Sequence, residues 1–318
     1  MTEGHDIKVT VMIPTYNQAD YLREAIDSAL AQTYEYLEVV VGDDASIDAT
    51  SEIVAEISDP RLRYVKRPFN IGRTENYRDL LYRHATGEFV VNLDGDDFFT
   101  DPDFITKGVS IIRSCPGLVM VVARATTKSQ TEKYVSNIPD HEVATGMQIL
   151  KRLPDKRYFL MHMATLYARK PALEIGFYRS SEISSDWESL YRLSLRGTVY
   201  FLDRNVGVWR IHGTNETGTT DPVKQIENLA IWPAIYSDAV VFGMGSVLAN
   251  FLSARCIAFF AKQGCVSVSL RGNLVVMKFL REVFRRHRFA ALLLLITPVY
   301  SLRVILCLFG YYRLKSVR

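Results

Sequence analysis

Short apolar runs alternate with helical repeats over the first 125 residues. The apolar runs predict β-strands, and they lie at 9–13, 37–44, 61–65, 88–93 and 117–123. Between them, segments such as QADYLREAIDSALAQT place apolar side chains three and four positions apart, which predicts helices. Strands that alternate with helices of this length are typical of βαβ units. We therefore expect an α/β fold with a mostly parallel sheet flanked by helices.

Local signals place the helices and the later strands. Helices are predicted at 18–33, 48–58 and 73–87, the last ended by Gly87, and from an Asp101-Pro102 N-cap to about Ser114. Further strands are predicted at 163–170, 198–203 and 206–212, with a helix at 185–197. From Pro222 onward the pattern is helical and increasingly apolar. We expect two domains, residues 1–220 and 221–318, that meet within GTTDPVK.

Three carboxylates follow the fourth predicted strand, at Asp94, Asp96 and Asp97 in NLDGDDFF. Ligands of parallel sheets bind beyond the carboxyl ends of the strands, so these acids should share an edge with Asp43-Asp44. Carboxylate oxygens are the ligands that Mg²⁺ and Mn²⁺ prefer, usually together with substrate phosphates. From spacing alone, a polar turn is an equally good interpretation. The chain has neither GxxxxGK[ST] nor GxGxxG after the first strand, so a metal is the remaining way to neutralise a phosphate.

Four segments occur in an order that resembles the family 2 glycosyltransferases. They are VTVMIPTYNQADYLREAIDSALAQTY, LEVVVGDDASIDAT, NIGRTENYRDLLYRHATGEFVVNLDGDD and SDWESLYRLSLRG…VWRIHG, within residues 7 to 216. The resemblance implies a Rossmann-like GT-A fold and an inverting enzyme that uses nucleotide-diphosphate sugars. It also implies a set of residues around the donor: Pro14, Thr15 and Tyr16 at the base and ribose, Asp43 or Asp44 at a base N–H, Asp94 at the ribose or metal, and Asp96 on a Mn²⁺ or Mg²⁺ ion that bridges the diphosphate.

The same resemblance suggests roles for two basic residues. Arg73 would contact phosphate, although a solvated arginine at a helix start is an equal alternative. His212 would contact the diphosphate or bind the metal, with a structural histidine as the alternative. Arg210 is expected to be structural, and Asp97 is the ambiguous third acid. A helix-capping role for a loop carboxylate fits Asp48 better than Asp43 or Asp44.

Asp186 matches the position of the general base that deprotonates the acceptor hydroxyl in the family. The alternative is structural, because Ser185 and Glu188 match a capping box, which would make Asp186 a favourable charge in the first turn. The family commonly has Glu-Asp at this point, whereas this chain has Ser185-Asp186. Ser185 therefore stands where the resemblance implies a glutamate, such as one that contacts the acceptor.

The charge of the chain divides unevenly. From Val266 to the end there are ten Lys or Arg residues and one acid, Glu282, so the tail carries +9 and the rest −6. The segment 278–289 interleaves basic and apolar residues, as interfacial helices do, and it precedes the apolar run 289–302, which is too short to span a bilayer. We expect membrane attachment at the cytoplasmic face of the inner membrane, peripheral or monotopic. The alternative is a helical subdomain with a solvated basic face.

These observations predict a metal-dependent inverting glycosyltransferase, a hexosyl- or related transferase of cell-surface polysaccharide or glycolipid synthesis. Its expected partners are a nucleotide-diphosphate sugar, a lipid-linked or oligosaccharide acceptor and a membrane surface, with no nucleic acid. Two alternatives remain. A sugar-phosphate nucleotidyltransferase would need a Gly-rich basic loop where this chain has PTYNQAD, and an inactive membrane adaptor would not need the acids.

Overall fold

Two compact units make up the chain in a computed structural model that describes residues 6–128, 133–154, 158–213, 218–309 and 311–312. The first unit comprises 1–149, 156–181 and 189–212, and the second comprises 150–155, 182–188 and 213–318. The predicted division after residue 220 assigned the two short segments to the first domain. Their contacts group them with the second unit instead.

The first unit contains a mixed ten-stranded sheet among the described residues, in the order β3-β2-β1-β4-β9-β6-β10-β5, with β7 beside β6 and β8 beside β10. Its strands are β1 (Val9–Thr15), β2 (Leu37–Asp43), β3 (Leu62–Lys66), β4 (Phe89–Asn92), β5 (Phe98–Phe99), β6 (Leu118–Lys128), β7 (Lys133–Val135), β8 (Val143–Thr145), β9 (Thr165–Ala168) and β10 (Thr198–Arg210). β3, β2, β1 and β4 pair in parallel, as β6 and β10 do. β9 lies antiparallel between β4 and β6. The predicted α/β class is confirmed, with antiparallel strands added to the parallel ones.

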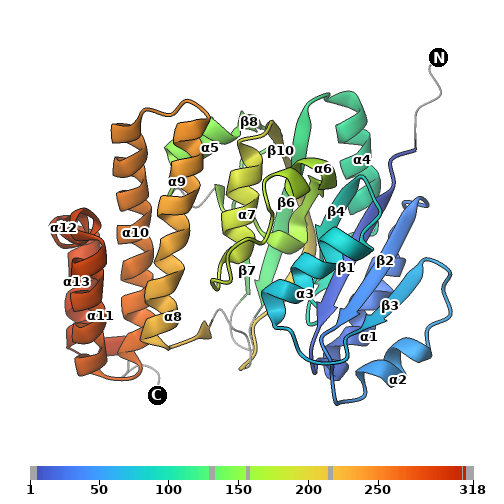
Figure 1. Cartoon of the computed structure of the whole chain (residues 1–318), viewed down its shortest axis with the longest axis horizontal. Helices are drawn as coiled ribbons and strands as arrows, with labels where there is room; N and C mark the ends of the chain where they lie inside the picture. Colours follow the sequence, from blue (N-terminus) through green and yellow to red (C-terminus); the bar gives the residue numbers. More distant parts are fainter. Residues whose placement is uncertain (1–5, 129–132, 155–157, 214–217, 310, 313–318) are drawn as a thin grey trace. The chain divides into compact units, whose positions relative to one another are not determined.

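Helices cover both faces of this sheet (Figure 1). The helices up to residue 194 are α1 (Ala19–Leu30), α2 (Thr50–Ala55), α3 (Arg73–Asp79), a π-helical turn (Leu80–His84), α4 (Phe104–Ser114), α5 (Gly146–Arg152), a 3₁₀ turn (His162–Ala164), α6 (Arg169–Glu174) and α7 (Ser185–Ser194). α5 and α7 each have residues in both units. One core cluster joins Val11 and Ile13 of β1 to α1 and α4. α3, with the π-helical turn, packs on the other face of β1 and β2. Every residue of β1 is buried, as a parallel strand covered on both faces requires.

Three sequence predictions are wrong in detail. The third helical segment ends at His84, so Gly87 does not end it. Gly87 instead allows close packing on β1, because a Cβ there would lie 2.6 Å from the backbone nitrogen of Thr10. The strands predicted at 198–203 and 206–212 form one strand, β10, with irregular pairing between Leu202 and Val208. The helix after Pro102 begins only at Phe104, so Asp101 is not its N-cap.

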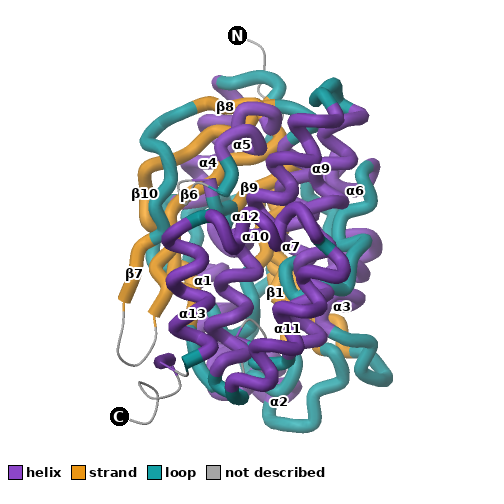
Figure 2. The backbone as a smooth tube through the Cα atoms, turned by 90° about the vertical axis from the view of Figure 1, so that its left-hand side faces the viewer, coloured by secondary structure: helices purple, strands orange, loops and turns teal. Residues whose placement is uncertain are grey.

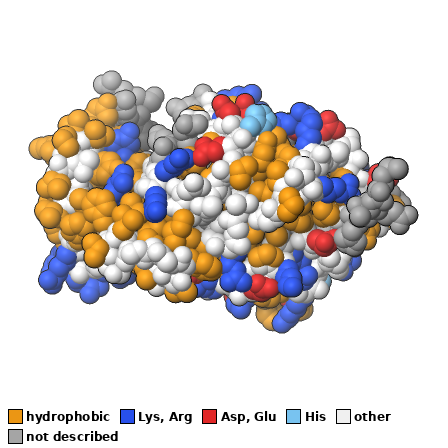
Figure 3. Space-filling view, turned by 90° about the horizontal axis from the view of Figure 1, so that it is seen from above, with side chains coloured by type: hydrophobic (Ala, Val, Ile, Leu, Met, Phe, Trp, Pro, Cys, Tyr) orange, Lys and Arg blue, Asp and Glu red, His pale blue; other side chains and the backbone are white. Residues whose placement is uncertain are grey.

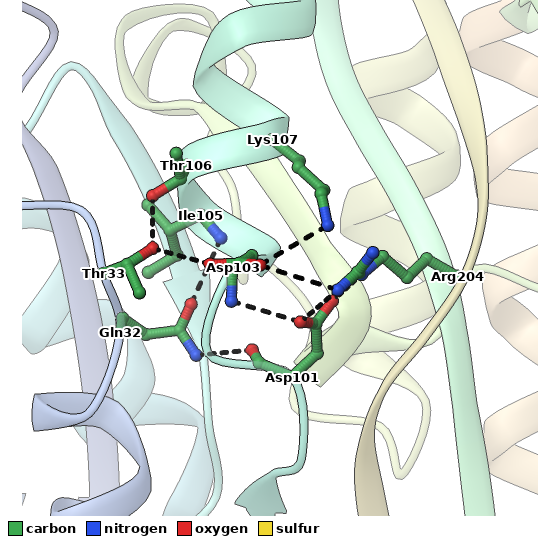
Figure 4. Close-up of polar contacts among 8 residues, drawn as sticks. All are labelled: Gln32, Thr33, Asp101, Asp103, Ile105, Thr106, Lys107 and Arg204. Atoms are coloured by element: carbon green, nitrogen blue, oxygen red, sulfur yellow. Dashed lines mark hydrogen bonds and ion pairs between the residues drawn. The ribbon is translucent and has the colours of Figure 1, made fainter.

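Asp101 instead joins three segments of the first unit (Figure 4). Its carboxylate accepts hydrogen bonds from Arg204 of β10, at 2.7 Å from Nη2, and from the N–H of Asp103. Its carbonyl accepts from the side chain of Gln32, which follows α1, at 2.8 Å. Burial alone would raise the pKa of Asp101, but the bonds from Arg204 and Asp103 outweigh it and hold the pKa below its ordinary value.

The second unit is helical. It contains α8 (Pro222–Glu227), a 3₁₀ turn (Asn228–Ala230), α9 (Ile231–Val241), α10 (Ser246–Ser269), α11 (Asn273–Arg286), α12 (Arg288–Ile296) and α13 (Pro298–Leu308). Asp221 is the N-cap of α8 and accepts from the N–H of Val223 at 2.8 Å, with Pro222 at the first helical position. The Asp-Pro signal therefore marks a helix start here and not at Asp101.

α10 is the centre of the second unit, and α9, α11, α12 and α13 all pack on it (Figure 2). Its middle is buried, and Gly264 lets α11 approach, because a Cβ there would lie 2.8 Å from the ring of Phe279. Among the described residues, α10 is the one helix long and apolar enough by itself to cross a membrane, but 67% of that stretch is buried inside the structure. Its apolar side chains therefore form the core of a helical unit.

The bond network of Asp101 predicts a stability effect. Arg204→Ala should lower the free energy of unfolding by about 1–2 kcal/mol at pH 7, because the buried carboxylate loses its charged donor. The pKa of Asp101 is lowered by folding, so its stabilising effect is present above its unfolded pKa and is lost as pH falls through the folded pKa. The difference between variant and wild type should thus shrink toward pH 3 in urea titrations. The control is Arg23→Ala. Arg23 forms an ion pair with Asp27 in which the two side chains are 52% and 54% exposed, so its loss should change stability less. An equal loss in both variants would contradict the role given to Asp101.

Candidate active site

Three carboxylates gather on the turn after β4. One oxygen from each of Asp94, Asp96 and Asp97 lies within 4.8 Å of the other two. The turn is closed by a hydrogen bond from the N–H of Asp97 to the carbonyl of Asp94, at 2.9 Å. Gly95 allows the turn to touch the end of β1, because a Cβ there would lie 2.8 Å from the hydroxyl of Thr15. Asp96 and Asp97 are only 7% and 2% exposed. The predicted acidic cluster therefore exists, and it includes Asp97.

The cluster holds like charges that the protein neutralises only in part. Burial and then the neighbouring Asp96 raise the pKa of Asp94 to about 6. Burial and the charges of Asp96 and Asp94 raise the pKa of Asp97 well above its ordinary value. Asp94 accepts from the hydroxyl of Tyr77 and from Asn92, both at 2.8 Å. Closely placed oxygen ligands with raised pKa values fit a hard divalent cation, which would remove the repulsion.

Arg210, the last residue of β10, and His212, just after the strand, lie against the cluster. His212 Nε2 is 2.8 Å from a carboxylate oxygen of Asp96, and its ring stacks on Tyr21 of α1 at 5.1 Å between centroids. The backbone N–H of Arg210 donates to Asp97 at 2.9 Å, and its guanidinium donates to the carbonyl of Asp96 at 2.7 Å. That guanidinium lies 4.3 Å from the ring centre of Phe98. Arg210 thus holds the turn in place, which agrees with the structural role expected for it.

The residues predicted at the base and ribose lie at the end of β1 and just beyond it. Pro14 and Thr15 are buried, and the Thr15 hydroxyl bonds the side chain of Gln18 at 3.1 Å. Tyr16 is 48% exposed. Of the three, only Tyr16 offers an exposed side chain, so Pro14 and Thr15 could reach a ligand chiefly through their backbone.

Asp43 and Asp44, at the end of β2, are both buried and bonded to the protein. Asp43 accepts from the N–H of Ser46 at 2.8 Å and from the hydroxyl of Tyr64. Asp44 accepts from the N–H groups of Ile71 and Gly72 at 2.7 and 2.9 Å, which fixes the loop before α3. Each carboxylate has further lone pairs for a ligand, but its position is set by these loops.

Asp48 has the capping role that its position suggested. One of its oxygens accepts from the N–H of Ala19, the first residue of α1, at 3.0 Å. The other accepts from the N–H of Thr50, the first residue of α2, at 3.2 Å. A single carboxylate therefore serves two helix starts.

Arg73 opens α3, directly after the loop held by Asp44. Its guanidinium carbon lies 5.6 Å from the ring centre of Tyr77, and its charge lowers the pKa of Asp94. The arginine is thus packed on an aromatic ring near the acidic cluster, and its contact with phosphate stays a prediction.

A buried aromatic group beside the cluster was not predicted from the sequence. Tyr77, which bonds Asp94, packs edge-on against His162 and tilted against Tyr178. His162 Nε2 and the Tyr178 hydroxyl are 2.6 Å apart. Burial lowers the pKa of His162 to about 3, so its ring is neutral at physiological pH. No sequence motif links these residues, because they come from three separate segments that only the fold brings together.

Asp186 lies in the first turn of α7. The helix begins at Ser185. Ser184, the residue before the helix, accepts the N–H of Glu188 on its carbonyl and is bonded through its own N–H to Asn228 at 2.8 Å. These bonds hold the start of α7, and the choice between a general base and a helix charge for Asp186 stays a prediction.

Comparisons with known proteins identify similar chains. The sequence model described as "Glycosyl transferase family 2" matches residues 10–176. An uncharacterized glycosyltransferase of Rickettsia typhi is 28% identical over 271 residues, 81% of each chain. An uncharacterized protein of Mycobacterium tuberculosis is 29% identical over 208 residues, 64% of this chain and 59% of that protein. This chain therefore spans little more than half the length of that relative.

Two solved structures share the fold. Residues 1–349 of S. aureus TarS, in complex with UDP, match with a TM-score of 0.64 and 17% identity over 96% of this chain and 91% of that one. The mannosyltransferase PcManGT of Pyrobaculum calidifontis, in complex with GDP-Man and Mn²⁺, matches with a TM-score of 0.57 and 18% identity over 98% and 86%. At these identities the likeness shows the fold, and it confirms the predicted GT-A fold.

The repulsion within the cluster predicts an effect of charge removal. Asp96→Asn should raise the melting temperature at pH 7.5 without metal by roughly 2 °C, because Asp94 and Asp97 lose the neighbouring charge of Asp96, which raises the pKa of both. The same change should abolish the stabilisation by Mn²⁺ that we expect of the wild type. Thermal melts with and without MnCl₂ measure both effects. A variant that melts lower than wild type and keeps its response to Mn²⁺ would refute the metal assignment.

The hydroxyl of Tyr77 predicts a pH-dependent metal affinity. Tyr77→Phe removes a donor that lowers the pKa of Asp94, so protons should compete with Mn²⁺ at higher pH than in wild type. We expect Mn²⁺ binding about 5-fold weaker at pH 6.5, as the loss of one hydrogen bond implies, and nearly unchanged at pH 8.5. Calorimetric titration at both pH values measures it. Tyr82→Phe, whose hydroxyl bonds only a distant carbonyl at 3.4 Å among the contacts described, is the matched control. Equal loss at both pH values would indicate simple misfolding of the site.

Proposed function

Because the chain belongs to glycosyl transferase family 2, we propose that it transfers a sugar from a nucleotide-diphosphate sugar to an acceptor hydroxyl, with inversion of the anomeric carbon. The observation that carries the proposal is the cluster of Asp94, Asp96 and Asp97 beside the carboxyl ends of β1 and β2, in which Asp96 and Asp97 are buried and Asp94 is partly exposed. The donors named for the two similar folds, UDP-GlcNAc for TarS and GDP-Man for PcManGT, support a nucleotide-sugar donor here.

The donor's nucleoside is proposed to bind at the ends of β1 and β2. Tyr16 supplies the exposed ring, and the backbone of Pro14 and Thr15 supplies the edge against which the ribose rests. Asp43 and Asp44 hold the two loops that would enclose the base, and either could accept from a base N–H with a remaining lone pair. Asp94 would face the ribose or the metal.

The diphosphate is proposed to bind between the acidic cluster and the basic residues around it. Asp96 and Asp94 would hold Mn²⁺ or Mg²⁺, which when bound neutralises the charge of the leaving nucleoside diphosphate. His212, whose Nε2 contacts Asp96, lies where it can donate to a phosphate oxygen or join the metal ligands. Arg73, packed on Tyr77, brings a positive charge to the same edge of the sheet.

Asp186 is proposed as the general base. It would take the proton of the acceptor hydroxyl as the oxygen bonds to the anomeric carbon and the bond to the diphosphate breaks. Attack from the side opposite the leaving group gives inversion in one step. The first turn of α7 supports this role, because a carboxylate on a regular helix held at Ser184 has a restricted orientation.

The acceptor is proposed to be a lipid-linked or oligosaccharide substrate at the cytoplasmic face of the inner membrane, in the synthesis of a surface polysaccharide or glycolipid. The basic tail from Val266 onward supports this location, since it carries ten Lys or Arg residues and one acid. A membrane-bound enzyme meets a lipid-linked acceptor in two dimensions, which favours encounter.

Substitution of the proposed base tests the mechanism. Asp186→Asn should keep donor affinity within about 2-fold and lower the transfer rate by about 10²- to 10⁴-fold, because the amide cannot accept the proton. Glu182→Gln, which removes a carboxylate four residues earlier, is the control and should transfer normally. Near-normal transfer by the Asp186 variant with a lowered melting temperature would assign this residue to helix stabilisation.

Donor binding separates the proposed function from its alternatives. Thermal-shift screening of UDP- and GDP-sugars with Mn²⁺ identifies the donor, and hydrolysis of that donor in the absence of acceptor reports turnover. Pyrophosphate release from a nucleoside triphosphate and a sugar phosphate would indicate a nucleotidyltransferase. Donor binding without hydrolysis or transfer to any acceptor would indicate an adaptor.

A further inference from the structure

The outer sides of α12 and α13 are apolar although they face away from the core of the second unit. α12 exposes Phe289, Leu292, Leu295 and Ile296, each by 46% or more. α13 exposes Val299, Leu302 and Ile305, and Phe309 follows directly after it, each exposed by 47% or more. Within each set the positions lie three or four residues apart, except for the neighbours Leu295 and Ile296, so each set forms one stripe, the outer stripe of that helix.

The inner sides of the same helices show that this exposure is not a failure to pack. Ala290, Ala291 and Leu294 of α12 are at most 2% exposed, as is Cys307 of α13. Both helices pack on α10, and the ring of Tyr300 lies 6.2 Å from that of Phe259. A surface helix of a water-soluble unit has polar residues opposite its buried stripe. α12 and α13 have apolar residues there instead, in an amount that monomeric soluble proteins rarely expose.

Basic residues border the outer stripes. Arg288 precedes Phe289 on α12, and Arg303 follows Leu302 on α13, and both are exposed. Arg255 of α10 lies 6.0 Å from the ring of Phe251, which in turn contacts the ring of Phe289. The one acid of α11, Glu282, is bonded to Arg285 and Arg286 of the same helix. Figure 3 shows hydrophobic side chains gathered over the second unit, with Lys and Arg side chains among and beside them.

The segment predicted from the sequence as interfacial, 278–289, covers most of α11 and the start of α12. Its apolar residues Phe279 and Val283 are buried within the unit, whereas Phe284 is 40% exposed. Lys278 and Arg281 are also exposed on α11. α11 thus exposes basic residues and part of its apolar residues, and the two helices that follow expose further apolar residues.

The geometry of α12 and α13 suits a helix pair that lies in a membrane surface and does not cross it. The two helices are bent by 92° at Thr297, between Ile296 and Pro298. With 9 and 11 residues, they are about 14 and 17 Å long, against a hydrocarbon core of about 30 Å. Neither can span a bilayer, and the bend prevents them from spanning it as one rod.

We propose that the outer stripes of α12 and α13 insert into the interfacial layer of an anionic lipid bilayer, with Arg255, Arg288 and Arg303 on the lipid phosphates. Apolar stripes bordered by cations and lacking acids match a surface whose acyl chains lie beneath anionic headgroups. A second copy of this chain would set the same cations against each other, because its stripe carries the same charges. The inference names the surface that would hold the proposed transferase at its membrane, and it can be tested without donor or acceptor.

Vesicle sedimentation of the full chain tests the proposal. Wild type should bind vesicles of phosphatidylcholine with 30% phosphatidylglycerol more tightly than pure phosphatidylcholine, with a preference that falls as NaCl rises. Leu292→Glu/Leu302→Glu should lower binding at least 10-fold to both vesicles, because two charges enter the apolar stripes. Arg288→Gln/Arg303→Gln should lower binding to anionic vesicles by about 5-fold per residue and leave binding to neutral vesicles unchanged.

The matched control is Val223→Glu on α8, which places the same charge on an exposed apolar residue of the same unit outside the stripes. It should bind like wild type. Point variants are preferable to truncation at Lys278, which would uncover the buried side of α10. Circular dichroism and melting temperature should match wild type in all variants, since only exposed side chains change. Wild-type binding by the Leu292/Leu302 variant, or no binding by wild type at low salt, overturns the proposal. The proposal is also overturned if the wild type does not bind vesicles but forms a dimer that the Leu292/Leu302 variant does not form. That result would show that the stripes bind a second copy of the chain.

Because no donor is present, failure of vesicle binding would leave the proposed transfer activity standing. Conversely, the Leu292/Leu302 variant should bind nucleotide sugar like wild type. If the wild type bound no nucleotide sugar, the proposed function would be refuted, whereas the result with vesicles would stand.

Discussion

The parallel pairing of β1 between β2 and β4 is the constraint on which the site depends. Thr15 pairs with Asp43, and hydrogen bonds from Leu93 to Met12 and from Gly95 to Pro14 continue the ladder past the end of β4. This backbone register places the loops after three strands at one edge. A shift of one residue would turn every side chain of β1 to the other face and would separate Thr15 from the turn at Gly95.

The acids of the first unit form two groups that differ in the direction of their pKa shifts. Asp48 and Asp101 are partly or largely buried, but hydrogen bonds to backbone N–H groups and to Arg204 lower their pKa values. Asp94 and Asp97 also receive donors, yet burial and mutual repulsion raise their pKa values. Mutual repulsion of this kind costs stability, which supports the metal site proposed for Asp94 and Asp96, whereas the lowered pKa values of Asp48 and Asp101 agree with their hydrogen bonds to the surrounding fold.

The second unit has an apolar interior and also an apolar exterior. α10 is covered by α8, α9, α11, α12 and α13, which satisfies the need to bury its side chains. The inner sides of α12 and α13 complete the core of the unit, so their outer stripes have no described part of the unit to pack against and stay exposed. If the surrounding medium were only water, this surface would promote aggregation. The basic residues at its border fit the anionic membrane surface that we propose.

Sequence alone determined the periodic elements, the family and the acidic turn, because these depend on local spacing. The run after residue 88 has to be a strand whatever surrounds it, and its three following carboxylates remain adjacent in any fold. Tertiary structure decided what depends on distant partners. Asp101 accepts a hydrogen bond from Arg204 of β10, far along the chain, and does not cap a helix. The rings of Tyr77, His162 and Tyr178 come into contact only because α3 packs against later segments. The sequence likewise recorded that the tail is basic and apolar, but only the packing on α10 decided which apolar residues are left for the outside, because burial is a property of contacts and not of composition.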